Sequence, residues 1–174
     1  ILDNIKKVEE LEDKYEAYQF YLDAVKRDGV PYDLITKALP TIEGEVNNIL
    51  SQLVDFQMLF EMDGKNINNY IVYDDDNVWP LELSSGMERF ISSLAIRVAL
   101  INVSNLPRSN FLAIDEGWGT MDSDNLNSVY SLFQYLKSQF QFTLIVSHID
   151  SMRDAVDTLL EIKKEKDYSN INFG

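Results

Sequence analysis

An acidic pair follows an apolar run in the second half of the chain, and its residue types suit phosphoryl chemistry. Phe111 to Ile114 are four consecutive apolar residues, and Asp115 and Glu116 come directly after them. An unbroken apolar run is typical of a strand buried on both faces of a parallel sheet, and ligands bind at the carboxyl ends of such strands. One carboxylate there can hold Mg²⁺ through water while its neighbour orients or deprotonates an attacking water. The pair is also compatible with the start of a solvated acidic loop.

Two further segments carry side chains that suit the same chemistry. Ser84, Ser85 and Gly86 precede apolar residues at helical spacing, which predicts a helix beginning at these residues. Free backbone N–H groups make a helix N-terminus an anion site, although a serine N-cap explains the two serines equally well. His148, the single histidine, ends a second apolar run that begins at Phe142. A lone histidine is more often packed or solvated, but its place at the end of a strand favours a role in the site.

Taken in order, these motifs resemble the C-terminal half of an ABC-type ATPase head. The signature motif is matched by LSSGM at 83–87, the Walker B strand by FLAIDE at 111–116, the D-loop by GTMD at 119–122 and the His switch by SH at 147–148. The run DEGWGTMD at 115–122 is similar to that of SbcC-type ATPases, which partner a nuclease in double-strand-break repair. Two departures affect the signature: Ser85 stands where glycine is usual, and Met87 where Gln or Glu is usual.

The resemblance implies a role for each site residue. Asp115 would support Mg²⁺, Glu116 would position or activate the attacking water, and His148 would sense the γ-phosphate of ATP. Residues 84–86 would reach the nucleotide held by a second copy of the head, and Asp122 would lie across that dimer interface. Asp122 is also suited to be only the N-cap of the helix that follows it.

A phosphate-cradling loop is missing from the chain. Such a loop needs the pattern GxxxxGK[ST], whereas the single Gly-Lys pair, Gly64-Lys65, is followed by Asn66 and has no glycine five positions before it. We therefore expect the chain to hydrolyse ATP only together with a Walker A lobe. In SbcC-like proteins that lobe is at the far N-terminus, beyond a long coiled coil, and the start at Ile1 without Met suggests a fragment of such a protein.

The first 27 residues have the spacing of a coiled-coil seam. Their apolar positions recur at intervals of three and four residues, namely Ile1, Ile5, Val8, Leu11, Tyr15, Tyr18, Leu22 and Val25. A helix of this length would extend about 40 Å and would pair with another helix, unless it packs on its own domain. We thus expect two domains, a coiled-coil base at 1–27 and the C-terminal lobe of the head at 28–174.

The remaining pattern predicts an α/β lobe with buried, largely parallel strands flanked by helices. Residues 32–53 read as helical with a break near Pro40, and 56–62 and 67–73 read as a hairpin. The acidic run at 74–76 is typical of a solvated loop rather than a metal site. A helix should follow Asp122, and 159–162 and 171–173 read as closing strands around a turn near Lys166.

Composition favours an intracellular, soluble protein, cytoplasmic or nuclear. The 174 residues are 45% hydrophobic and include no cysteine, and no signal peptide or apolar run of about 18 residues is present. The net charge of −14 disfavours broad DNA contact. Contact with DNA would need local cations such as Lys163, Lys164 and Lys166, which equally suit a solvated strand end, or it would come from partners.

The resemblance predicts a head that dimerises on ATP and regulates a metallophosphatase-type nuclease on double-stranded DNA. One alternative is an SMC-type structural clamp that embraces DNA without a nuclease. Another is a degenerate regulatory half that no longer turns over ATP, which Met87 in the signature suggests.

Overall fold

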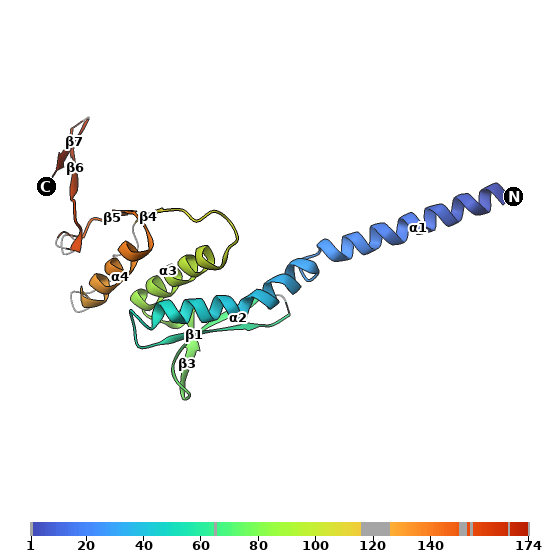
Figure 1. The fold of residues 1–174 in the computed structure, drawn as a ribbon, viewed down its shortest axis with the longest axis horizontal. Helices are drawn as coiled ribbons and strands as arrows, with labels where there is room; N and C mark the ends of the chain where they lie inside the picture. Colours follow the sequence, from blue (N-terminus) through green and yellow to red (C-terminus); the bar gives the residue numbers. More distant parts are fainter. Residues whose placement is uncertain are drawn as a thin grey trace.

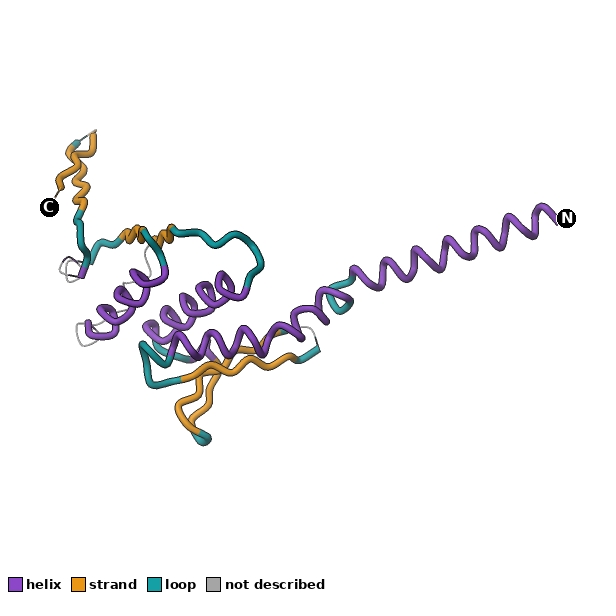
Figure 2. The backbone as a smooth tube through the Cα atoms, in the orientation of Figure 1, coloured by secondary structure: helices purple, strands orange, loops and turns teal. Residues whose placement is uncertain are grey.

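The computed structural model describes residues 2–64, 66–115, 126–149, 153, 155–166 and 168–173, and its fold is α/β. A long N-terminal helix leads into a body of helices and short sheets, and a hairpin ends the chain (Figures 1 and 2). Among the described residues, no helix is both long and apolar enough to cross a membrane.

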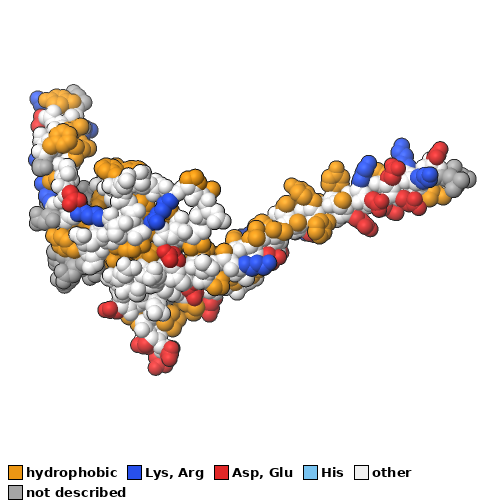
Figure 3. Space-filling model, in the orientation of Figure 1, with side chains coloured by type: hydrophobic (Ala, Val, Ile, Leu, Met, Phe, Trp, Pro, Cys, Tyr) orange, Lys and Arg blue, Asp and Glu red, His pale blue; other side chains and the backbone are white. Residues whose placement is uncertain are grey.

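The first helix, α1 (Leu2–Val25), extends away from the body of the molecule (Figure 1). Its large apolar side chains are exposed along the whole helix, from Ile5 at 49% to Phe20 at 77%. On the face that Figure 3 shows, apolar side chains are most prominent on the half of α1 nearer the body, and charged side chains toward the N-terminus. Gly29 follows the helix, and a Cβ there would lie 2.4 Å from the carbonyl oxygen of Ala24, so glycine is required where the chain turns into the next helix.

The second helix, α2 (Val30–Leu50), runs without a break through Pro40, so the predicted interruption is wrong. Pro31 lies in its first turn, where a missing N–H costs nothing. Pro40 removes one hydrogen bond, to the carbonyl of Thr36. Burial of one face stabilises the helix on both sides of Pro40, through Leu39 before it and Val46, Ile49 and Leu50 after it.

An antiparallel sheet of order β1-β2-β3 packs against α2, with β1 at Gln57–Met62, β2 at Ile67–Asp74 and β3 at Asn77–Pro80. The predicted hairpin is present as β1 and β2, with Met58 paired to Ile71, both buried. The edge of β1 that does not pair with β2 is hydrogen-bonded to α2. The Asn47 side chain donates to the Met58 carbonyl at 2.9 Å and accepts from the Met58 N–H at 2.7 Å. The acidic run at 74–76 forms the exposed β2–β3 turn, where Asp74 accepts hydrogen bonds from Asn77.

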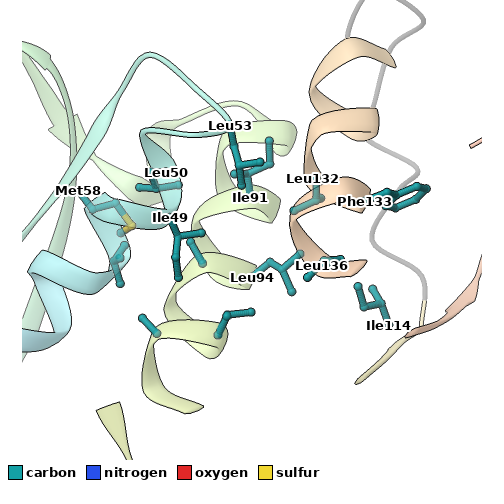
Figure 4. Packing of buried hydrophobic residues seen from close by; sticks show 14 of the residues in the cluster. Ile49, Leu50, Leu53, Met58, Ile91, Leu94, Ile114, Leu132, Phe133 and Leu136 are labelled. Carbon is teal, nitrogen blue, oxygen red and sulfur yellow. The ribbon is translucent and has the colours of Figure 1, made fainter. Parts of the chain in front are cut away.

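Two more helices complete the core. A short 3₁₀ helix, η1 (Leu81–Leu83), leads into α3 (Gly86–Val103), and α4 (Leu126–Gln139) follows later in the chain. Figure 4 shows how Ile49 and Leu50 of α2, Ile91 and Leu94 of α3, and Leu132 and Leu136 of α4 lie within one cluster. This cluster holds the signature helix on the body of the molecule.

The parallel pair is formed by β4 (Phe111–Asp115) and β5 (Phe142–Val146), with Asp115 paired to Val146. Alternate residues of the pair, such as Ile114 and Ile145, face the core, whereas Phe111 and Leu144 are each 45% exposed. We predicted burial on both faces, and within this chain it holds for one face. The apolar pattern predicts that both faces of the pair are covered, and the described residues cover one of them.

The chain ends in a hairpin of β6 (Leu160–Glu165) and β7 (Tyr168–Phe173). These strands occupy the predicted closing positions but are longer than expected, and Lys166 in the turn has a positive φ of 51°. Of the strand pairings among the described residues, β4 with β5 is parallel and the others are antiparallel. The largely parallel sheet that we predicted is therefore present here as one parallel pair.

Candidate nucleotide site

The signature segment forms the N-terminus of α3, as its serines and glycine predicted. Ser85 is the N-cap, and it forms a capping box with Glu88. The Glu88 backbone N–H donates to Ser85 Oγ at 3.3 Å, and the Ser85 N–H donates to Glu88 Oε2 at 2.6 Å. The N–H groups of Gly86 and Met87, at the next two positions, have no acceptor within the helix. The capping box was not predicted, although the Ser-x-x-Glu spacing at 85–88 is its usual signal.

The two serines of the signature have different surroundings. Ser84 is 8% exposed, and its hydroxyl donates to the carbonyl of Leu81 at 2.6 Å. Ser85 is exposed at the helix end. Met87 is partly buried against the core cluster, which accounts for an apolar residue at this position. Ser85 and Gly86 are therefore the residues of this segment that present polar groups at the helix end, while Ser84 stabilises the turn before them.

Glu88 remains ionised at neutral pH. Partial burial acts to raise the pKa of its carboxyl, but hydrogen bonds from Tyr73 and from both donors of Ser85 outweigh that effect and hold the pKa below its ordinary value. A negative charge in the first turn of a helix is stabilised by the helix dipole. The first turn of α3 thus contains one fixed carboxylate beside two N–H groups that have no acceptor within the helix.

The second half of the site lies at the carboxyl end of the parallel pair. Asp115 is the last residue of β4, and its partner in register, Val146, is the last residue of β5, so the chain reaches exposed His148 two residues later at the same edge. The Ile149 N–H donates to Ser147 Oγ at 3.1 Å, which forms a local turn around the histidine. Glu116 and Asp122 lie outside the described residues.

Asp115 is suited to a magnesium ion that also binds phosphates. It is exposed, and among the described residues no three metal-binding side chains cluster together. Mg²⁺ is usually held by one or two carboxylates, several waters and substrate phosphates rather than by a cage of protein ligands. A single carboxylate at a strand end fits that donor set. Within the described residues, no hydrogen bond joins Asp115 or His148 to the signature segment.

Comparisons with known proteins show what the chain is similar to. No protein-family model matches the chain. An uncharacterized protein of Acanthamoeba polyphaga mimivirus is 34% identical over 98% of the chain, and the SbcC component of the SbcCD nuclease of Bacillus subtilis is 25% identical over 88%. The chain spans 14% of the length of each relative. The corresponding SbcC component of Staphylococcus aureus is 30% identical over 51% of the chain and 9% of its own length.

Solved structures show the same fold. An Smc head domain with an extended coiled coil, bound to the C-terminal domain of ScpA and derived from Pyrococcus furiosus, has a TM-score of 0.67 at 17% identity. The match covers 99% of this chain and 44% of that one. The SMC head domain from Thermotoga maritima has a TM-score of 0.56 at 23% identity, covering 82% and 50%. The sequence relatives assign the chain to the SbcC-type, SMC-like group of ABC ATPases, as a C-terminal lobe of the head, and the solved structures show that it has the fold of an SMC head.

Proposed function

We propose that this lobe supplies the signature and Walker B halves of an ATP-hydrolysing site, and that it works only with a Walker A lobe. The observation that carries the proposal is the position of Asp115, at the end of a parallel pair whose outer face is apolar and open. Phe111 and Phe142 stack on that face with ring centroids 5.4 Å apart. Covering such an apolar face with another layer removes it from water and lowers the free energy of the protein. The Walker A lobe of the same protein is our proposed cover.

Within one head, the edge of the parallel pair would act on the bound nucleotide. Asp115 would hold Mg²⁺, most simply through water, and the ion would neutralise charge on the phosphates. Glu116, the next residue, would position or activate the attacking water. His148 would donate toward the γ-phosphate from the end of β5. These assignments follow from chain position and from the chemistry of the residues.

Across a head dimer, the N-terminus of α3 would reach the nucleotide of the second copy. The free N–H groups of Gly86 and Met87 and the exposed hydroxyl of Ser85 are donors for a phosphate. Ser84 would maintain the turn through its bond to Leu81. Asp122 would lie at the dimer interface. Two ATP molecules would then be enclosed by two heads related by twofold symmetry.

The coiled-coil base would transmit head closure to other partners. Residues 1–27 form our proposed coiled-coil base, because the apolar side chains of α1 are left exposed by the described residues of this chain. A metallophosphatase-type nuclease and double-stranded DNA are the proposed partners of the intracellular complex, in the cytoplasm or nucleus. Lys163 pairs with Glu161 at 2.9 Å, so Lys164 and Lys166 are the better candidates for DNA contact in the C-terminal hairpin.

The open face can be tested by measuring how the chain binds a separately produced Walker A lobe, by calorimetry. Leu144→Ser should weaken binding at least tenfold, because it removes buried apolar area from the contact. Leu100→Ser is the matched control, since Leu100 is 47% exposed on α3 and Leu144 is 45% exposed on β5. Equal binding by both variants would contradict the proposed cover.

The proteins that co-purify with the intact protein distinguish a nuclease complex from a structural clamp. Co-purification of a metallophosphatase-type nuclease with the intact protein supports the first, and a stable complex without nuclease supports the second. A degenerate regulatory half would bind its partners but show no ATP turnover in the assembled head.

A further inference from the structure

A tyrosine of the antiparallel sheet is hydrogen-bonded to the carboxylate that caps the signature helix. The Tyr73 hydroxyl donates to Glu88 Oε1 at 2.6 Å, while Glu88 Oε2 accepts from the Ser85 N–H at 2.6 Å. One carboxylate therefore joins strand β2 to the first turn of α3. The capping box between Ser85 and Glu88 is complete without the tyrosine, so the bond from Tyr73 is an additional restraint.

The backbone and the neighbouring rings direct Tyr73 toward this contact. The register of β2 with β3 shifts between Val72 and Asp74, so Tyr73 stands at a β-bulge. Bulges change the direction in which a side chain points. The ring, which is 43% exposed, contacts those of Phe56, with centroids 5.6 Å apart, and Trp79, with centroids 5.4 Å apart. These two ring contacts support the orientation in which the hydroxyl reaches Glu88.

The tyrosine stays a hydrogen-bond donor over the whole physiological range. Burial and the bond to the Glu88 carboxylate raise the pKa of Tyr73 to about 12. A neutral hydroxyl beside an ionised carboxylate forms a charge-assisted hydrogen bond, which is stronger than a neutral one. The Glu88 side chain is thus fixed at both oxygens.

The orientation of Glu88 matters because an anion is expected at the same helix end. A carboxylate in the first turn competes with phosphate for N–H groups and repels it. We propose that Tyr73 is a positioning residue of the trans nucleotide site: it keeps the Glu88 carboxylate on the Ser85 N–H and away from the N–H groups of Gly86 and Met87. This role rests on the proposed function, in which those two groups receive a phosphate from the second head.

The test uses the assembled head, made of this chain and a Walker A lobe, with Glu116→Gln to block turnover. Light scattering gives the ATP concentration at half-dimerisation. Tyr73→Phe removes the hydroxyl and keeps the ring, and it should raise that concentration about tenfold, the scale of one hydrogen bond to a charged group. ATP binding by a single head should be unchanged. Tyr70→Phe on the same strand is the matched control and should behave as the parent does.

A second substitution separates positioning from support of the fold. Combining Tyr73→Phe with Glu88→Gln removes the negative charge of the carboxylate that Tyr73 no longer holds. The ATP concentration at half-dimerisation should therefore return most of the way to that of the parent. A purely structural role predicts no recovery. Hydrogen exchange of the Ser85 N–H should also be faster in Tyr73→Phe than in Tyr70→Phe, because Glu88 is less firmly held.

The outcomes distinguish this role from the function on which it rests. If the parent head does not dimerise with ATP, the proposed trans site fails, and the positioning role fails with it. If the parent dimerises and Tyr73→Phe has the same half-dimerisation concentration, the positioning role alone is wrong. A loss that Glu88→Gln does not relieve also overturns it.

Discussion

The N-terminus of α3 and the β4–β5 pair, which we propose as the signature and Walker B regions, differ in how much of their support the chain itself provides. The N-terminus of α3 has a capping box, a buried serine before it and a core of three helices beneath it. The β4–β5 pair has the same core on one face and exposed apolar residues on the other. The N-terminus of α3, which would act on a second head, is supported within the described residues. The β4–β5 pair, which would act within its own head, has one apolar face that those residues leave exposed.

This difference has a functional reason under the proposed function. A signature segment must keep its shape in the free head, because it meets the nucleotide only when two heads close. A Walker B edge works beside the phosphate cradle, so its surroundings can be completed by the Walker A lobe. Each side of the contrast can therefore be broken separately by substitution.

The largest effect is expected at the Walker B edge. Glu116→Gln in the assembled head should retain ATP binding and lower hydrolysis by about 10²- to 10³-fold, because the residue that orients or deprotonates water is lost. Steady-state turnover and nucleotide binding measured on one preparation check it. Unchanged turnover would remove Glu116 from the mechanism.

The signature side should fail in assembly rather than in nucleotide binding. Ser85→Arg places a bulky cation at the exposed helix end, so ATP-dependent dimerisation of Glu116→Gln heads should be lost while a single head still binds ATP. Ser84→Arg is a poorer probe, because Ser84 is buried and the change should destabilise the lobe. Heads with Ser85→Arg that still dimerise on ATP, by light scattering, would show that Ser85 is only an N-cap.

In the isolated chain, substitutions in the core and on the open β4–β5 face should have different effects on the free energy of unfolding. Leu50→Ala, in the core, should cost about 2–5 kcal/mol of unfolding free energy. Leu144→Ala, on the open face, should stay within about 0.5 kcal/mol. Urea unfolding followed by circular dichroism measures both. A large loss for Leu144→Ala would mean that the β4–β5 face is already covered within this chain.

The smallest effect concerns the cap itself. The pKa of Glu88 is depressed below its ordinary value of 4.5, so its contribution is present above that value and is lost as pH falls through the folded pKa. The stability difference between the parent and Glu88→Gln should therefore be level above about pH 5, at no more than about 1 kcal/mol, and shrink in acid. A difference that grows as pH falls would contradict the assignment of the cap.

The sequence predicted the elements whose signals are local and missed those set by tertiary packing. The signature helix, the hairpin at 57–74 and the paired ends of β4 and β5 follow from short patterns of apolar residues. Helix α2 continues through Pro40 because burial of its apolar face outweighs the one hydrogen bond that proline removes. Strand β3 was missed because four residues ending in proline give little signal.

The candidate site was predicted by motif and adjusted by geometry. The Ser-x-x-Glu spacing at 85–88 marks Ser85 as the N-cap, but no sequence pattern shows that the Ser84 hydroxyl turns inward to the Leu81 carbonyl. The contact between Tyr73 and Glu88 joins residues 15 positions apart in sequence. It depends on a bulge in β2, which periodicity does not reveal.

ATP turnover of this chain alone and together with a Walker A lobe tests the central claim most directly. The account predicts background phosphate release from the isolated chain, sustained release from the assembled head, and loss of that release with Glu116→Gln. Robust turnover by the isolated chain, or an assembled head that stays inactive although it binds ATP and dimerises, would contradict the claim that this lobe is half of a working ATPase.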